Sequence, residues 1–104
     1  MNIVFIDDNE ALLRSAALLI RSAGHDVKTF ADPHQAKECL TTTPVDVLIL
    51  DYVFPGMTGD DLLESVRNRL PSHCRVVLIS GHTDLIDRPL LEKMGVDLFL
   101  PKPL

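Results

Sequence analysis

The sequence lacks several features that mark special classes of protein. It has only two cysteines in 104 residues, Cys39 and Cys74, and their separation fits neither a metal site nor a redox pair. No apolar run approaches the roughly 20 residues that a membrane helix needs, and the N-terminus has no basic stretch followed by a long apolar one, as a signal peptide would. Lysine and arginine do not cluster, and the formal net charge is −5. These absences predict a cytoplasmic domain that binds neither a membrane nor nucleic acid.

Short apolar runs alternate along the chain with segments of helical periodicity. We expect strands at residues 3–6, 27–30, 45–50, 75–79 and 98–100, and helices at 9–23, 32–40, from 58 or 59 to about 70, and 87–94. Strands that are apolar almost throughout are typical of a parallel sheet with helices on both faces. Right-handed crossovers then predict one doubly wound, flavodoxin-like α/β domain over residues 1–104, with five strands in the order 2-1-3-4-5.

The last predicted strand has no helix after it. The sequence closes with Lys102-Pro103-Leu104, so four helices must cover the two faces of a five-stranded sheet. Part of one apolar face would then be exposed. We therefore expect the 104 residues to be a truncated piece of a longer protein, or to pair with a second copy as a homodimer.

Polar side chains follow four of the predicted strands. Asp7 and Asp8 follow the first strand, Asp51 the third, Ser80 the fourth and Lys102 the fifth. Because the carboxyl ends of parallel strands meet at one edge of a sheet, we expect these side chains to share a pocket. Three neighbouring carboxylates repel one another unless a cation compensates them, and oxygen ligands suit Mg²⁺. A lysine and a hydroxyl beside them make the pocket suitable for phosphoryl transfer to a carboxylate.

In this combination the chain resembles the receiver domain of two-component response regulators over essentially its whole length. The family pattern has an acidic pair after the first strand, a phospho-accepting aspartate after the third, Ser or Thr after the fourth and Lys-Pro after the fifth. This sequence matches it with Asp7-Asp8, Asp51, Ser80 and Lys102-Pro103, and with the segment Pro55-Gly56-Met57-Thr58-Gly59 behind the acceptor. The separations of 43, 29 and 22 residues between Asp8, Asp51, Ser80 and Lys102 are similar to the family's.

The resemblance implies a phosphorylation-dependent signalling switch. Asp51 would accept a phosphoryl group from the phosphohistidine of a sensor histidine kinase. Asp7, Asp8 and Asp51 would hold Mg²⁺ together with the backbone carbonyl of Val53, and Lys102 would neutralise charge on the transferring group. Such a domain is not an enzyme toward other substrates, since it catalyses only its own phosphorylation and dephosphorylation.

The same resemblance implies how the signal would leave the site. Ser80 would bind a phosphoryl oxygen, and Phe99, at the family's switch-aromatic position, would turn inward. An output domain would lie on a longer chain. Phe99 lacks the hydroxyl of a tyrosine switch. Val53 and His82 flank the phosphoryl site. Because the Val53 side chain is apolar, it cannot orient an attacking water, so we expect a long-lived phosphoryl group.

Three alternatives stay open at the level of sequence. A degenerate receiver would serve as a phosphorylation-independent binding module. A haloacid-dehalogenase-like phosphatase also has a nucleophilic aspartate after an apolar strand, but its pattern has a second aspartate at the position that Val53 occupies in this chain. A mononucleotide-binding domain would need a glycine-rich phosphate loop after the first strand, where Asp7-Asp8-Asn9-Glu10 stands instead.

Overall fold

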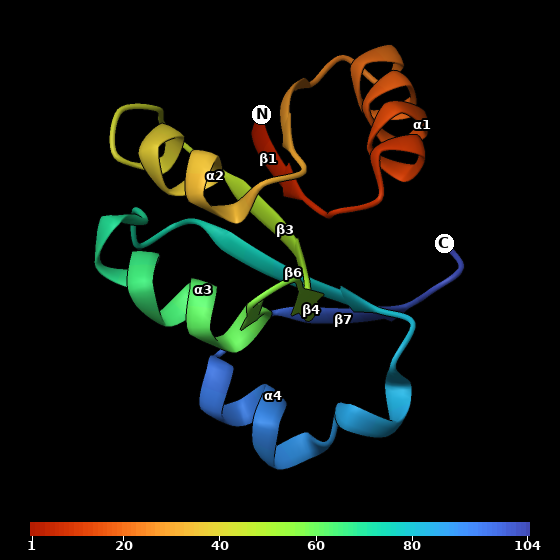
Figure 1. Cartoon of the computed structure of the whole chain (residues 1–104). Coiled ribbons are helices and arrows are strands. Elements are labelled where there is room, and N and C mark those ends of the chain that lie inside the picture. The colour runs from red at the N-terminus through yellow and green to blue at the C-terminus, as the bar shows by residue number, and fades with distance from the viewer.

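Five parallel strands form the centre of the molecule in the computed structural model, which describes residues 1–104 (Figure 1). The strands of the main sheet are β1 (Asn2–Ile6), β2 (Asp26–Phe30), β3 (Val47–Asp51), β6 (Arg75–Ser80) and β7 (Leu98–Pro101). Their order is β2-β1-β3-β6-β7. The predicted doubly wound order 2-1-3-4-5 is therefore confirmed, because the two intervening strands belong to a separate hairpin.

Four α-helices connect the strands: α1 (Glu10–Ser22), α2 (Pro33–Leu40), α3 (Gly59–Val66) and α4 (Arg88–Met94). Side chains cap the start of each one. Asn9, Asp32 and Asp87 accept backbone N–H groups from the first turns of α1, α2 and α4. Short 3-10 turns, η1 (Arg67–Arg69) and η2 (Thr83–Leu85), complete the connections. None of the helices combines the length and hydrophobicity required to cross a bilayer.

Two predicted elements had wrong boundaries. The third strand was expected at residues 45–50, but it begins at Val47 and includes Asp51. Val45 is buried without belonging to the ladder, which shows that burial alone does not define a strand. The third helix was expected to continue to about residue 70, but the α-helix ends at Val66 and the chain tightens into η1.

The hairpin β4 (Val53–Phe54) with β5 (Met57–Thr58) was not predicted. Its turn uses Gly56 with φ +82°, a backbone region that only glycine adopts freely. Two-residue strands are too short to produce an alternating apolar pattern, so the Pro55-Gly56 turn was the only available signal.

The two faces of the sheet are covered unequally. Helices α2, α3 and α4 pack on one face and bury the larger core, whereas α1 alone packs on the other, through Leu13 and Ala17 (Figure 1). On the α1 side, Val77 is only partly buried, and Leu98 and Leu100 are 51% and 38% exposed. The expected uncovered apolar face is present and lies over β6 and β7.

Candidate functional site

A cleft of about 400 Å³ opens at the carboxyl edge of the sheet. It is lined by Asp8, Asn9, Asp51, Val53, Gly81, His82 and Lys102. These residues come from the ends of β1, β3, β6 and β7, so the crossover topology gathers segments far apart in sequence. This is the edge at which the sequence predicted a shared pocket.

Asp51 occupies the end of the central strand. It is the last residue of β3, which pairs with β1 on one side and with β6 on the other, and it is 5% exposed. One carboxylate oxygen, Oδ1, accepts the Tyr52 N–H at 2.8 Å, and the other, Oδ2, accepts from Lys102 Nζ at 3.0 Å. Strand pairing and both contacts hold the carboxylate in one orientation, with access from the cleft.

Asp7 is fully buried beside it. Its Oδ1 accepts the Asn9 N–H at 2.9 Å, and its Oδ2 lies 2.7 Å from Lys102 Nζ. No hydrogen bond of good angular geometry reaches Oδ2, which leaves a buried carboxylate oxygen that is compensated only by charge. Such an oxygen fits a site that receives a further cation.

Asp8 completes an acidic cluster at the mouth of the cleft. Carboxylate oxygens of Asp7, Asp8 and Asp51 lie within 4.8 Å of one another. Partial desolvation raises the pKa of Asp8 above its ordinary value, and the neighbouring charges of Asp7 and Asp51 raise it further. Three carboxylates face one lysine, so the chemistry of the donor set fits a hard divalent cation such as Mg²⁺.

Lys102 is the cation that the protein itself supplies. Burial alone would lower the pKa of Lys102, but its interactions with the Asp7 and Asp51 carboxylates outweigh burial and raise that pKa. The side chain is therefore an ammonium at neutral pH. The Lys102–Pro103 peptide bond that follows is cis.

Ser80 adjoins the cleft, and Phe99 lies in the neighbouring strand. Ser80 is the last residue of β6, is fully buried, and accepts the His82 N–H with its Oγ at 2.9 Å. A hydroxyl can accept and donate at once, so its own hydrogen is available for another acceptor. Phe99 lies opposite Leu78 in the sheet and packs, half-buried, against the larger core.

Sequence reasoning missed two residues of the cleft and one behind it. Asn9 lines the cleft in addition to capping α1, and Gly81 lines it directly after Ser80. Gly59 lies directly behind Asp51, where an added Cβ would press on the Asp51 carbonyl. The segment from Pro55 to Gly59 signalled Gly59 as part of a motif, but its physical role needed the structure.

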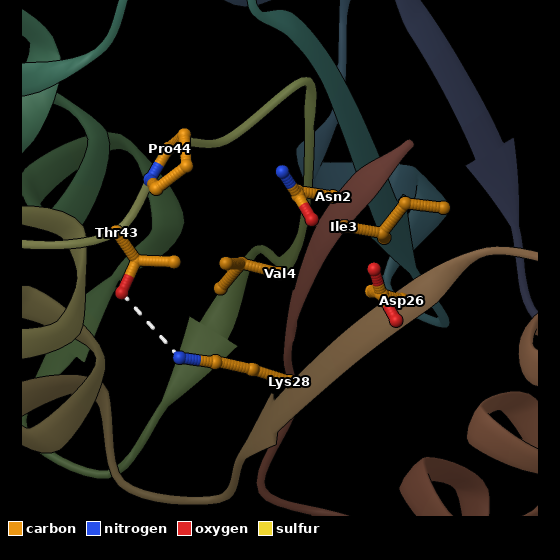
Figure 2. Close-up of a pocket in the computed structure, with 7 residues that line it drawn as sticks. All are labelled: Asn2, Ile3, Val4, Asp26, Lys28, Thr43 and Pro44. Carbon is orange, nitrogen blue, oxygen red and sulfur yellow. Dashed lines mark hydrogen bonds between the residues drawn. The ribbon is translucent and has the colours of Figure 1, made fainter.

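A second hollow lies at the opposite, amino-terminal edge of the sheet. Figure 2 shows its lining residues, among them Lys28, whose Nζ is 3.5 Å from Thr43 Oγ1. Its volume is about 30 Å³, enough for a single water molecule. That volume is too small for a substrate, whereas the acidic cleft has room for one and gathers Asp8, Asp51 and Lys102.

Comparison with known proteins agrees with this geometry. The family model for the response regulator receiver domain matches residues 3–104. The DNA-binding response regulator MtrA of Mycobacterium leprae is 29% identical over 101 residues, which are 97% of this chain and 44% of that protein. The chain thus spans less than half the length of this curated relative.

Solved structures show the same fold. The receiver domain of the hybrid histidine kinase CckA is 33% identical, with a TM-score of 0.82 over 100% of this chain and 87% of that one. The response regulator TrrA of Thermotoga maritima, solved in complex with Mg²⁺ and BeF, has a TM-score of 0.82 at 18% identity over 99% of this chain and 87% of that one. On the match to residues 3–104, the chain belongs to the response regulator receiver domain family, a family of signalling switches in two-component systems.

Proposed function

We propose that this chain is a working receiver that accepts a phosphoryl group on Asp51 and changes conformation in response. One observation carries the proposal: Lys102 Nζ lies between buried carboxylate oxygens of Asp7 and Asp51, at 2.7 and 3.0 Å. Building such a cluster is costly for stability. A cation next to an accessible nucleophilic carboxylate is what phosphoryl transfer requires.

The acidic cluster supports a role for Mg²⁺. Asp7, Asp8 and Asp51 are the side chains that would hold the ion, with the backbone carbonyl of Val53 as a further ligand. When bound, Mg²⁺ would neutralise phosphoryl oxygens and orient them toward the acceptor. The TrrA structure contains Mg²⁺ and BeF. Here Asp7 Oδ2 is paired with Lys102 but accepts no well-aligned hydrogen bond, which leaves it able to bind the same ion.

The proposed transfer step uses groups that lie in the cleft. An Asp51 carboxylate oxygen forms a bond to the phosphorus of a kinase phosphohistidine. The phosphorus–nitrogen bond breaks, and its electron pair returns to the imidazole. Lys102 moves from pairing with the Asp51 carboxylate to pairing with a phosphoryl oxygen, because the charge it compensates moves outward along the new acyl phosphate.

Ser80 and Phe99 form the proposed switch. The free hydrogen of the Ser80 hydroxyl would donate to a phosphoryl oxygen, which draws the end of β6 toward Asp51. Phe99, half-buried two strand positions before Pro101, would turn further into the space beneath. The output would be a change in the surface around α4, and the domain acts on no other substrate.

The wider setting follows from the family. We expect a sensor histidine kinase as phosphodonor, a cytoplasmic location, and an output domain on a longer chain, since relatives such as MtrA are more than twice as long. We also propose that a further segment of such a chain, or a second copy, covers Leu98 and Leu100. A concentration-dependent rise in molar mass by sedimentation would favour the second copy.

Acetyl phosphate tests the function directly. We expect the native chain to gain one phosphoryl group when Mg²⁺ is present, as measured by intact mass, and the Asp51→Asn variant to gain none. A folded native chain that stays unmodified would instead favour a degenerate receiver. In that case binding of beryllofluoride, which needs the same pocket, would be absent as well.

A further inference from the structure

Gly59 lies where two backbone segments touch behind the acceptor. It is the first residue of α3, and its N–H donates to the carbonyl oxygen of Tyr52. A Cβ built on Gly59 would stand 3.0 Å from Tyr52 Cα and 3.3 Å from the Asp51 carbonyl carbon, and it would lie well within the van der Waals contact distance of the Asp51 carbonyl oxygen. The backbone is not in the left-handed region here, so the glycine is required for space rather than for its dihedral angles.

Neither segment can move away easily. Asp51 ends the central strand, which is paired on both sides. The start of α3 is held by a capping box, in which Thr58 Oγ1 accepts the Asp61 N–H and Asp61 Oδ2 accepts the Thr58 N–H, both at 3.3 Å. Fully buried Leu62 fixes the first turn of α3 in the core.

The segment between these fixed ends is the short loop that contains the β4–β5 hairpin. It begins at Tyr52, returns at Thr58, and includes Val53, whose carbonyl is the proposed backbone ligand of the metal. A side chain at residue 59 must push one end of this loop. The displacement then falls on the Asp51 carboxylate, on Tyr52 and on Val53.

We propose that Gly59 is a positioning residue of the acceptor site. Because it lets the start of α3 contact the backbone of Asp51 and Tyr52, Gly59 fixes the positions of both the Asp51 carboxylate and the Val53 carbonyl. This inference rests on the proposed function for its consequence, but the positioning itself exists without metal or phosphate.

The Gly59→Ala variant tests the proposal in the chain of residues 1–104. Without metal, we expect the amide NMR signals of Tyr52 and Val53 to shift and their hydrogen exchange to accelerate, because the Tyr52 N–H bonds to Ile79 O and Asp51 Oδ1 are disturbed. With Mg²⁺, calorimetric titration should show affinity reduced at least fivefold and phosphorylation by acetyl phosphate slowed similarly.

Gly95→Ala is the matched control. It places a side chain at a glycine with φ +64°, far from the cleft, and so destabilises the fold without touching the acceptor. We expect a lower melting temperature with native Mg²⁺ affinity. Equal loss of affinity in both variants, or a folded Gly59→Ala with native amide signals and native affinity, would overturn the proposal.

A second variant covers the case in which Gly59→Ala does not fold. One glycine inserted after Gly56 of that variant lengthens the loop and absorbs the displacement. We then expect folding to recover while Mg²⁺ affinity stays low; full recovery of both would overturn the proposal. If instead the native chain binds no Mg²⁺, the proposed function fails, and the metal-free amide signals still decide the role of Gly59.

Discussion

Lys102 Nζ lies 3.0 Å from Asp51 Oδ2, although 51 residues separate the two in sequence. The same nitrogen is 2.7 Å from Asp7 Oδ2. One flexible side chain thus connects the ends of three different strands, and in the proposed transfer it would follow the charge from the carboxylate to the phosphoryl group. Stability and chemistry are therefore linked at this side chain.

Replacing Asp8 by Asn should stabilise the chain when no divalent cation is present. Asp8 is crowded by two other carboxylates, and removing its charge relieves repulsion that solvent screens only in part. We expect the metal-free variant to melt about 2–5 °C above the metal-free native chain by calorimetry. Added Mg²⁺ should raise the melting temperature of the native chain but not that of the variant. Asp84→Asn, an exposed change of equal charge on η2, should have no such effect.

Replacing Lys102 by Met should destabilise the chain. The substitution keeps an apolar stem but leaves the buried Asp7 carboxylate without its cation, which costs about 3 kcal/mol by analogy with other broken buried pairs. Urea unfolding measures the loss, and the Asp7→Asn/Lys102→Met double variant should recover most of it. Independent, additive losses would show that the two groups do not depend on each other.

Replacing Val53 by Asn should shorten the life of the acyl phosphate. Val53 lines the cleft with an apolar side chain, so water that approaches the phosphoryl group finds no hydrogen-bond partner there. An amide would orient that water, and we expect loss of phosphate to accelerate severalfold in a mass-based time course. Val53→Ile, which keeps the apolar character, provides the comparison; equal rates for Asn and Ile would contradict this explanation.

Replacing Arg67 by Ala should loosen α4. The Arg67 guanidinium donates to the Met94 carbonyl oxygen and lies 3.5 Å from that of Gly95, so it satisfies carbonyls at the C-terminus of α4. We expect the free energy of unfolding to fall by about 1 kcal/mol, since the side chain is partly solvated. Arg69→Ala, a neighbouring exposed arginine of η1, should change it by less than about 0.5 kcal/mol.

Acid stability should depend on two aspartates at the other edge of the sheet. The Asn2 N–H, bound at 2.7 Å, is the main reason that the pKa of Asp46 lies below its ordinary 3.8, with His73 assisting. The Val76 N–H, bound at 2.8 Å, likewise lowers the pKa of Asp97 from 3.8, while burial opposes the shift and Arg75 assists it.

The sign of the pH effect follows from these shifts. A carboxyl group whose pKa is lower in the folded state adds stability above its unfolded pKa and loses it as the pH falls through the folded value. We therefore expect Asp46→Asn/Asp97→Asn to be less stable than the native chain at pH 6 and to show a flatter decline below pH 3.8 in thermal unfolding. An unchanged pH profile would show that these bonds do not contribute.

The sequence alone was sufficient to predict the fold and the gathering of Asp7, Asp8, Asp51 and Lys102. Buried parallel strands leave a strong apolar pattern, and their crossover rule then brings the strand ends together. Contacts between backbone segments leave no such pattern. The place of Gly59 against Asp51 and the short β4–β5 hairpin depend on distances of a few ångströms that residue types do not encode.

The burial and pairing of individual aspartates could not be predicted from the sequence either. Nothing in Asp7-Asp8 indicates that the first aspartate is fully buried while the second is exposed, because the direction of each side chain depends on where β1 ends. Likewise no sequence pattern indicates that Asp60 pairs with Lys93 at 3.1 Å and joins α3 to α4.

The position of Lys102 after β7, the last strand, also has a consequence for the order in which the protein is made. A nascent chain can pair β1, β2 and β3 and so assemble Asp7, Asp8 and Asp51 while the lysine is still unsynthesised. The acidic edge then has no internal counter-charge until β7 aligns with β6. Under the proposed function, a chain in which β7 has not yet aligned with β6 would lack Lys102 in the cleft and would not accept a phosphoryl group.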